Sequence, residues 1–174
     1  GTDIIAFGDS LIAGVGAEEG MTLPEQLSRK LGVPIINEGI SGATTRDGVR
    51  VIESVLVQYH PRLVILSLGG NDFLQKIPRE ETKRNLAYII RTIEAQGSMV
   101  LILGVRSGLI GGGFDAEFEE LASQYKTLYV EDVLSDIFGD TRYMSDAVHP
   151  NSIGYGLIAD RIVKALRKEK IVLR

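Results

Sequence analysis

The sequence predicts an α/β protein, a three-layer sandwich in which helices cover both faces of a central parallel sheet of about five strands. Short apolar runs alternate with longer amphipathic segments along the whole chain, and the links between them are short. No repeat, low-complexity tract or linker interrupts this alternation. A length of 174 residues suits one sizeable core, so we expect residues 1–174 to form a single domain.

The first quarter of the chain predicts two strands with a helix between them. Residues 4–7 (Ile-Ile-Ala-Phe) are apolar and rich in β-branched side chains, which is typical of a buried strand. The helix begins at Thr22, because Thr22 with Glu25 three positions later fits a capping box. Gly32 is suited to end this helix, and residues 33–37 predict the second strand.

A second long helix and a third strand follow. Thr44 or Thr45 can cap the helix, which runs to Tyr59 and carries its apolar side chains on one face. Pro61 stops it, and residues 63–68 predict the third strand.

The second half of the chain continues the alternation. Two helices and two strands are expected, at residues 79–95, 99–103, 115–124 and 128–130. Asn151 or Ser152 caps a last helix that runs to about residue 170. Because strands alternate with helices and the links are short, the sheet should be parallel and covered on both faces.

Composition and charge exclude several classes of function. The chain is 44% hydrophobic and 24% charged, and its net charge of −4 comes from interspersed acids and bases. The absence of a basic patch argues against nucleic acid as a partner. The chain contains no cysteine, so disulfides, thiolate catalysis and zinc–thiolate sites are excluded.

No part of the sequence predicts a membrane span. No apolar run approaches the ~18 residues that such a helix needs, and no signal peptide is visible. The chain starts with Gly1-Thr2-Asp3, without Met, and enters a strand almost at once. We therefore expect a soluble domain that is cytoplasmic, or exported with a trimmed N-terminus. The sequence makes no prediction about oligomeric state.

The strongest functional signal is a serine directly after the first predicted strand. Ser10 stands in the segment Gly8-Asp9-Ser10-Leu11, and open α/β sheets place their ligands at the carboxyl ends of strands. Near the other end of the chain, Asp146 and His149 lie three residues apart, just before the last helix. A serine, a base and an acid that can meet are the minimum for covalent acyl transfer.

Two further segments complete an ordered set of motifs, Ile40-Ser41-Gly42-Ala43 and Gly69-Gly70-Asn71-Asp72. All four segments, in this order, resemble the GDSL/SGNH hydrolase family, and most closely its small thioesterase/lysophospholipase/arylesterase branch. The resemblance covers residues 7–151 and the closing helix. It implies a flavodoxin-like fold and a serine esterase, and it implies no metal or organic cofactor.

The expected catalytic roles follow from chemistry as well as from the resemblance. Ser10 would be the nucleophile, and a serine hydroxyl needs a base to take its proton. His149 would be that base, because the other histidine of the chain, His60, precedes the third strand and should lie at the opposite end of the sheet. Asp146 would accept the second ring N–H of His149 and fix its tautomer.

The resemblance also implies an oxyanion hole for the tetrahedral intermediate. Its donors would be the backbone N–H groups of Ser10 and Gly42 and the side-chain amide of Asn71. A glycine lets the substrate approach closely, and an amide donates without a charge. We interpret Asp9 and Asp72 as supporting residues that hydrogen-bond local backbone N–H groups.

Apolar residues expected near the carboxyl edge of the sheet are candidates for an acyl pocket. They are Leu11, Phe73, Leu109, Ile110, Phe114, Tyr143 and Met144. Three glycines at 111–113, between apolar neighbours, suggest a flexible lid over that pocket. We therefore expect a small-molecule ester substrate, such as a small acyl, aryl or lysophospholipid ester, with acyl thioesters as a further class.

Three alternatives remain beside this interpretation. A carbohydrate acetylesterase of the same fold is less favoured, because 6% aromatic residues and no tryptophan give few stacking platforms for sugars. A binding module that has lost the chemistry is disfavoured, because every required group is present. Gly14, Gly16 and Gly20 with Glu38 imitate a dinucleotide-binding fingerprint, but these glycines begin well beyond the turn that follows the first strand.

Overall fold

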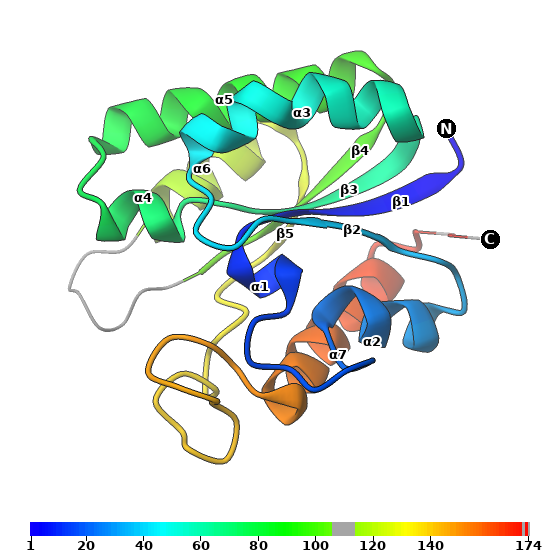
Figure 1. Ribbon diagram of the computed structural model, residues 1–174. Helices are drawn as coiled ribbons and strands as arrows, with labels where there is room; N and C mark the ends of the chain where they lie inside the picture. The colour runs from blue at the N-terminus through cyan, green and yellow to red at the C-terminus, as the bar shows by residue number, and fades with distance from the viewer. Residues whose placement is uncertain (106–113, 172, 174) are drawn as a thin grey trace.

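A central sheet of five parallel strands runs through the protein (Figure 1). The computed structural model describes residues 1–105, 114–171 and 173. The strands of this described part are β1 (Asp3–Gly8), β2 (Ile36–Gly39), β3 (Pro61–Ser67), β4 (Met99–Leu103) and β5 (Leu128–Val130). They lie in the order β2-β1-β3-β4-β5, and each neighbouring pair is parallel.

Helices cover both faces of the sheet (Figure 1). One face carries α1 (Ser10–Ala13), α2 (Leu23–Leu31) and α7 (Ser152–Lys168). The other carries α3 (Thr45–Tyr59), α4 (Gly70–Leu74), α5 (Arg79–Ala95) and α6 (Asp115–Tyr125). The predicted three-layer α/β fold is therefore confirmed. Across the described part of the chain, no helix is both long and apolar enough to cross a membrane.

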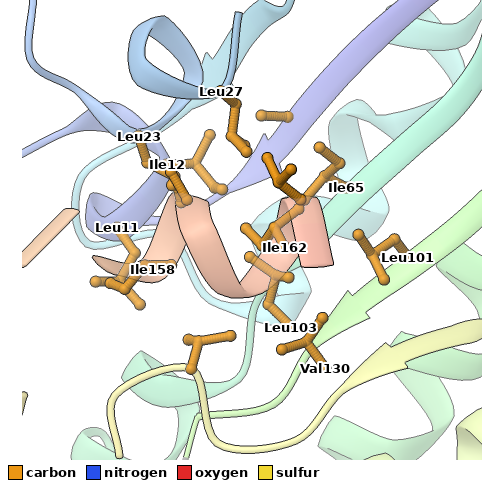
Figure 2. Close-up of a cluster of buried hydrophobic side chains, with 14 of the residues drawn as sticks. Leu11, Ile12, Leu23, Leu27, Ile65, Leu101, Leu103, Val130, Ile158 and Ile162 are labelled. Carbon is orange, nitrogen blue, oxygen red and sulfur yellow. The ribbon is translucent and has the colours of Figure 1, made fainter. Parts of the chain in front are cut away.

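Helices bury both faces of the sheet. Successive side chains of a strand point to opposite faces, so each strand contributes to two apolar clusters. In β1, Ile4 and Ala6 belong to one apolar cluster, while Ile5 and Phe7 belong to the other. Figure 2 shows the first cluster, in which side chains of α1, α2 and α7 pack against β1, β3, β4 and β5. Burial of each large aliphatic side chain stabilises the fold by about 1.5–3 kcal/mol, so these two clusters hold the layers together.

Capping residues start the long helices where the sequence predicts them. Thr22 and Glu25 form the expected capping box of α2, in which the Glu25 carboxylate accepts the Thr22 backbone N–H at 2.9 Å. Thr44, and not its neighbour, is the N-cap of α3. Asn151 is the N-cap of α7, and its side chain accepts the Gly154 N–H at 2.9 Å. The cap at Asn151 fixes where the loop before α7 ends.

One strand and two short helices differ most from the sequence prediction. β2 begins at Ile36 instead of residue 33, and its pairing with β1 starts at Ile5 and Ile36. The helices α1 and α4 were not predicted at all. They have four and five residues, which is too short to display a helical periodicity in the sequence.

The strand order creates a topological switch point between β1 and β3. After β1 the chain turns to the face of α1 and α2, and after β3 it turns to the face of α4 and α5 (Figure 1). Open α/β sheets bind ligands at such a point, outside the carboxyl ends of the strands. The two segments that leave this point carry Ser10 and Asn71.

Candidate active site

Ser10 is the first residue of α1, just beyond the carboxyl end of β1. Asp9 caps this helix, and its side chain accepts the Leu11 N–H at 3.0 Å. The Asp9 N–H donates to the Ser67 carbonyl of β3 at 3.1 Å. Gly8 makes this close approach possible, because a Cβ at Gly8 would lie 2.1 Å from the same oxygen. Backbone contacts between β1 and β3 therefore fix the position of Ser10.

His149 lies in a loop that its own hydrogen bonds close. The Asp146 carboxylate accepts the backbone N–H groups of Val148 and His149, both at 2.7 Å. The Ser145 N–H donates to the His149 carbonyl at 2.8 Å. Because Asp146 binds the backbone that carries His149, one short turn orients both side chains.

The structure brings Ser10, His149 and Asp146 into contact. His149 Nε2 lies 3.1 Å from Ser10 Oγ, and His149 Nδ1 lies 2.9 Å from Asp146 Oδ2. Hydrogen bonds from the ring and backbone of His149 lower the pKa of Asp146 to about 2, so its carboxylate is ionised at neutral pH. With a proton on Nδ1, His149 is set to accept the Ser10 proton on Nε2. His60 ends α3 and precedes β3, at the opposite end of the sheet.

The two other residues expected in the oxyanion hole lie on segments that a hydrogen bond joins. Asn71, in α4, donates its side-chain Nδ2 to the Ala43 carbonyl at 2.9 Å. The amide has two N–H groups, and this bond uses one of them. Gly42 precedes Ala43 and has a φ of +79°, a left-handed conformation that favours glycine. Backbone conformation is the structural reason for this glycine, since a Cβ there would meet no atom within 4 Å.

An apolar pocket opens beside these polar groups. Ser10, Asn71 and His149 line it. Its apolar walls are formed, among the described residues, by Leu11, Leu68, Phe73, Leu74, Val105, Leu134, Phe138 and Val148. Polar groups that converge at one end of an apolar pocket suit a ligand with an apolar chain and a polar head. In the part of the chain that the structure describes, no group of three or more His, Asp or Glu side chains could hold a metal ion.

The structure places the residues expected in the acyl pocket in different ways. Leu11 and Phe73 line the pocket. Leu109, Ile110 and the glycines at 111–113 lie outside the described residues, and so does the lid expected there.

Phe114, Tyr143 and Met144 are not among the lining residues of the pocket. Phe114 is buried in the apolar cluster between the sheet and α6, with its ring 6.0 Å from that of Phe118. Tyr143 and Met144 pack against the cluster on the opposite face, and the Arg142 guanidinium lies over the Tyr143 ring. All three side chains contribute to the packing of the core, and a role for them in substrate binding stays a prediction.

Sequence reasoning missed several residues that line the pocket. Leu134 and Phe138 lie between β5 and α7, in a segment with no long helix or strand. Val105 follows β4, and Val148 precedes the proposed base. The four-residue spacing of Leu134 and Phe138 is the one signal that could have suggested a shared direction for these two side chains.

Two buried aspartates support the site. Burial raises the pKa of Asp9 to about 6, although the hydrogen bond from Leu11 and the nearby His149 oppose the rise. Asp72 is fully buried and accepts the N–H of Thr45, which is 27 positions away. The partner of Asp9 is local, as expected, whereas Asp72 joins distant segments.

The chain is similar in sequence to known proteins. Residues 6–157 match the model of the GDSL-like Lipase/Acylhydrolase family. The chain is 27% identical over 172 residues to thioesterase 1/protease 1/lysophospholipase L1 of Escherichia coli strain K12, covering 94% of this chain and 83% of that one.

Solved structures also resemble it. A crystal structure of TesA has a TM-score of 0.90 and 26% identity, covering 95% of this chain and 98% of TesA. The SGNH-hydrolase family esterase AlinE4 has a TM-score of 0.77 and 31% identity, covering 97% and 96% of the two chains. The resemblance seen in the four sequence motifs is thus confirmed, and the chain belongs to the GDSL-like lipase/acylhydrolase family.

Proposed function

We propose that this chain hydrolyses carboxylic esters through an acyl-enzyme formed on Ser10. The observation that carries the proposal is the line of contacts from Ser10 through His149 to Asp146, which opens directly onto an apolar pocket. The catalytic side chains supply a nucleophile, a base and an orienting carboxylate. The pocket supplies a place for an acyl chain next to the nucleophile.

In the acylation step, Ser10 Oγ attacks the ester carbonyl carbon while its proton passes to His149 Nε2. The negative charge on the carbonyl oxygen is held by the N–H groups of Ser10 and Gly42 and by the Asn71 amide. The bond to the leaving alcohol then breaks, and His149 gives its proton to that oxygen. Asp146 stabilises the imidazolium that forms between these two transfers.

In the deacylation step, His149 takes a proton from water, and the resulting hydroxide attacks the acyl carbon. The bond to Ser10 Oγ breaks, Ser10 recovers its proton from His149, and the carboxylic acid leaves. All bonds and protons balance with water as the only second reactant. A thioester would follow the same route with a thiol as the leaving group.

The apolar lining of the pocket favours acyl groups over sugars. Its walls are leucine, valine and phenylalanine side chains, and the polar groups gather at the nucleophile. The Escherichia coli relative carries thioesterase and lysophospholipase in its name, which supports acyl esters and thioesters as the substrate class. A carbohydrate acetylesterase would place hydroxyl groups against these apolar walls, at a cost in desolvation.

Hydrolysis of a p-nitrophenyl ester series from acetate to palmitate tests this proposal, with wild type and Ser10→Ala assayed side by side. We expect activity in the wild type, its loss in Ser10→Ala, and a preference for acyl chains longer than acetate. An organophosphonate should add to Ser10, as seen by peptide mass spectrometry. A wild type that cleaves acetylated saccharides but no acyl ester would favour the sugar esterase instead, and labelling at another residue would refute the role of Ser10.

A further inference from the structure

Asp72 lies in α4 directly after Asn71, and its side chain is fully buried. Its carboxylate accepts the Thr45 N–H at 2.8 Å, the Thr45 hydroxyl at 2.5 Å and the Thr82 hydroxyl at 2.9 Å. Thr45 begins α3, and Thr82 lies in the first turns of α5. A buried carboxylate is stable only where donors surround it. Asp72 therefore holds α4 against the N-terminal ends of α3 and α5.

One more side chain orients the Thr45 hydroxyl. Asn85 Nδ2 donates to Thr45 Oγ1 at 3.0 Å, and the Thr45 hydroxyl then donates to Asp72. Each oxygen of the carboxylate has at least one donor. The three donors therefore use both oxygens of the Asp72 carboxylate. An amide side chain at this position would present only one oxygen.

Neighbouring residues of α4 bind the same short segment at two points. Asn71 donates to the carbonyl of Ala43, and Asp72 accepts the N–H of Thr45. Gly42, whose backbone N–H is a proposed oxyanion donor, directly precedes Ala43 on this segment. The link through Asp72 therefore restricts movement of the segment that carries Gly42 relative to the side chain of Asn71.

We propose that Asp72 is a positioning residue of the oxyanion hole, which sets the spacing between the Gly42 N–H and the Asn71 amide. The inference rests on the proposed function, because it needs an oxyanion at that place. Donors stabilise a transition state only when they point at the position of the developing charge. A displacement of about 1 Å can lower a rate on the order of 100-fold.

Asp72→Asn is the direct test. The side chain keeps its size but presents one oxygen and one NH₂ group to three donors, so the link to Thr45 is weakened. We expect kcat for p-nitrophenyl esters to fall by about 10- to 100-fold while KM changes by less than about threefold. The two constants separate because the acyl chain binds the apolar pocket in the ground state, whereas the oxyanion donors act in the transition state.

A pair of variants at Thr82 provides a second test if Asp72→Asn does not fold. Thr82→Val removes one donor from the carboxylate at nearly constant volume, and Thr82→Ser retains the hydroxyl. We expect kcat of Thr82→Ser to exceed that of Thr82→Val severalfold, with similar KM values. Equal kcat values in the two folded variants would count against the proposal.

A matched control separates positioning from general stability. Ser98 has a buried hydroxyl that donates to the Pro61 carbonyl at 2.5 Å, at the amino end of the sheet. Ser98→Ala should lower the urea midpoint, because it deletes a buried hydrogen bond, and should leave kcat unchanged. If Ser98→Ala loses as much kcat as Asp72→Asn, the loss reflects stability and the positioning role is refuted.

Inhibition by phenylboronic acid gives a readout that a purely structural role would not move. The boronate forms a tetrahedral adduct with a serine and places a negative oxygen in the oxyanion hole, so its inhibition constant should rise in parallel with the fall in kcat/KM. A folded Asp72→Asn with kcat within about twofold of wild type, or with unchanged boronate affinity, overturns the inference alone. Absence of Ser10-dependent hydrolysis in the wild type overturns the proposed function and this inference together.

Discussion

Replacing Asp9 by Asn should change how the stability of this protein depends on pH. Burial raises the pKa of Asp9 from 3.8 to about 6 in the folded state. Between these two values the folded protein binds more protons than the unfolded chain, so stability falls as pH rises. The favourable contribution is complete below the unfolded value and is lost above the folded one. Asn at this position does not titrate.

The size of the effect follows from the shift. A rise of roughly two pKa units corresponds to about 3 kcal/mol at 1.36 kcal/mol per unit. Asp9 is 6% exposed, so solvent screens this group only weakly. The Asn side chain can still accept the Leu11 N–H and cap α1, which keeps the local structure comparable. We therefore expect the stability of Asp9→Asn relative to wild type to increase by up to about 3 kcal/mol between pH 4 and pH 7.

Urea unfolding of both proteins at half-unit steps from pH 4 to pH 8 measures this difference. Circular dichroism reports the transition, and a constant slope with urea shows that the two unfolded states are comparable. Titrating groups that do not interact with Asp9 are common to both proteins and cancel in the comparison. A difference in unfolding free energy that stays constant from pH 4 to pH 8 would refute the reasoning, because it would show that folding does not raise the pKa of Asp9.

Three further predictions concern the proposed catalytic groups and the packing around them. Asn71→Ala should lower kcat by about 10²–10³-fold without unfolding the protein, and near wild-type turnover would remove Asn71 from the oxyanion hole. The kcat/KM value should fall as the solution is acidified, because a protonated imidazole cannot act as base, while the pKa of about 2 keeps Asp146 ionised. A rate that rises below pH 5 would contradict this. Tyr155→Phe should lower the free energy of unfolding by about 1–3 kcal/mol, because the buried Tyr155 hydroxyl donates to the Val15 carbonyl at 2.6 Å, and an unchanged urea midpoint would disprove it.

Local sequence signals were sufficient for the long elements of the fold. The capping box at Thr22 and Glu25 depends on side chains three positions apart, so the sequence contains everything that forms it. The β-branched runs that became the strands depend only on neighbours in the chain. The start of β2 was misplaced, because residues 33–37 do not show by themselves where the pairing with β1 begins.

Short helices and the pocket wall escaped the same reasoning. α1 and α4 each span about one turn. A backbone contact between β1 and β3 positions α1, and the hydrogen bonds of Asp72 hold α4. Leu134 and Phe138 reach the pocket from an irregular segment, where no periodicity indicates direction. Phe114 was expected to line the pocket because of its place in the sequence, whereas its large ring is buried in the core.

The sequence by itself determined the fold class, the family and the kinds of catalytic group, because these depend on patterns and motifs along the chain. Only the tertiary structure decided which groups touch. Ser10 and His149 are 139 positions apart in the sequence. Their 3.1 Å contact exists because β1 ends and α7 begins at the same edge of the sheet. Asp72 looked like one more residue of a turn, and its three hydrogen bonds became visible only when α3, α4 and α5 were packed together. Contacts between distant segments are set by the packing of whole elements, which local sequence does not specify.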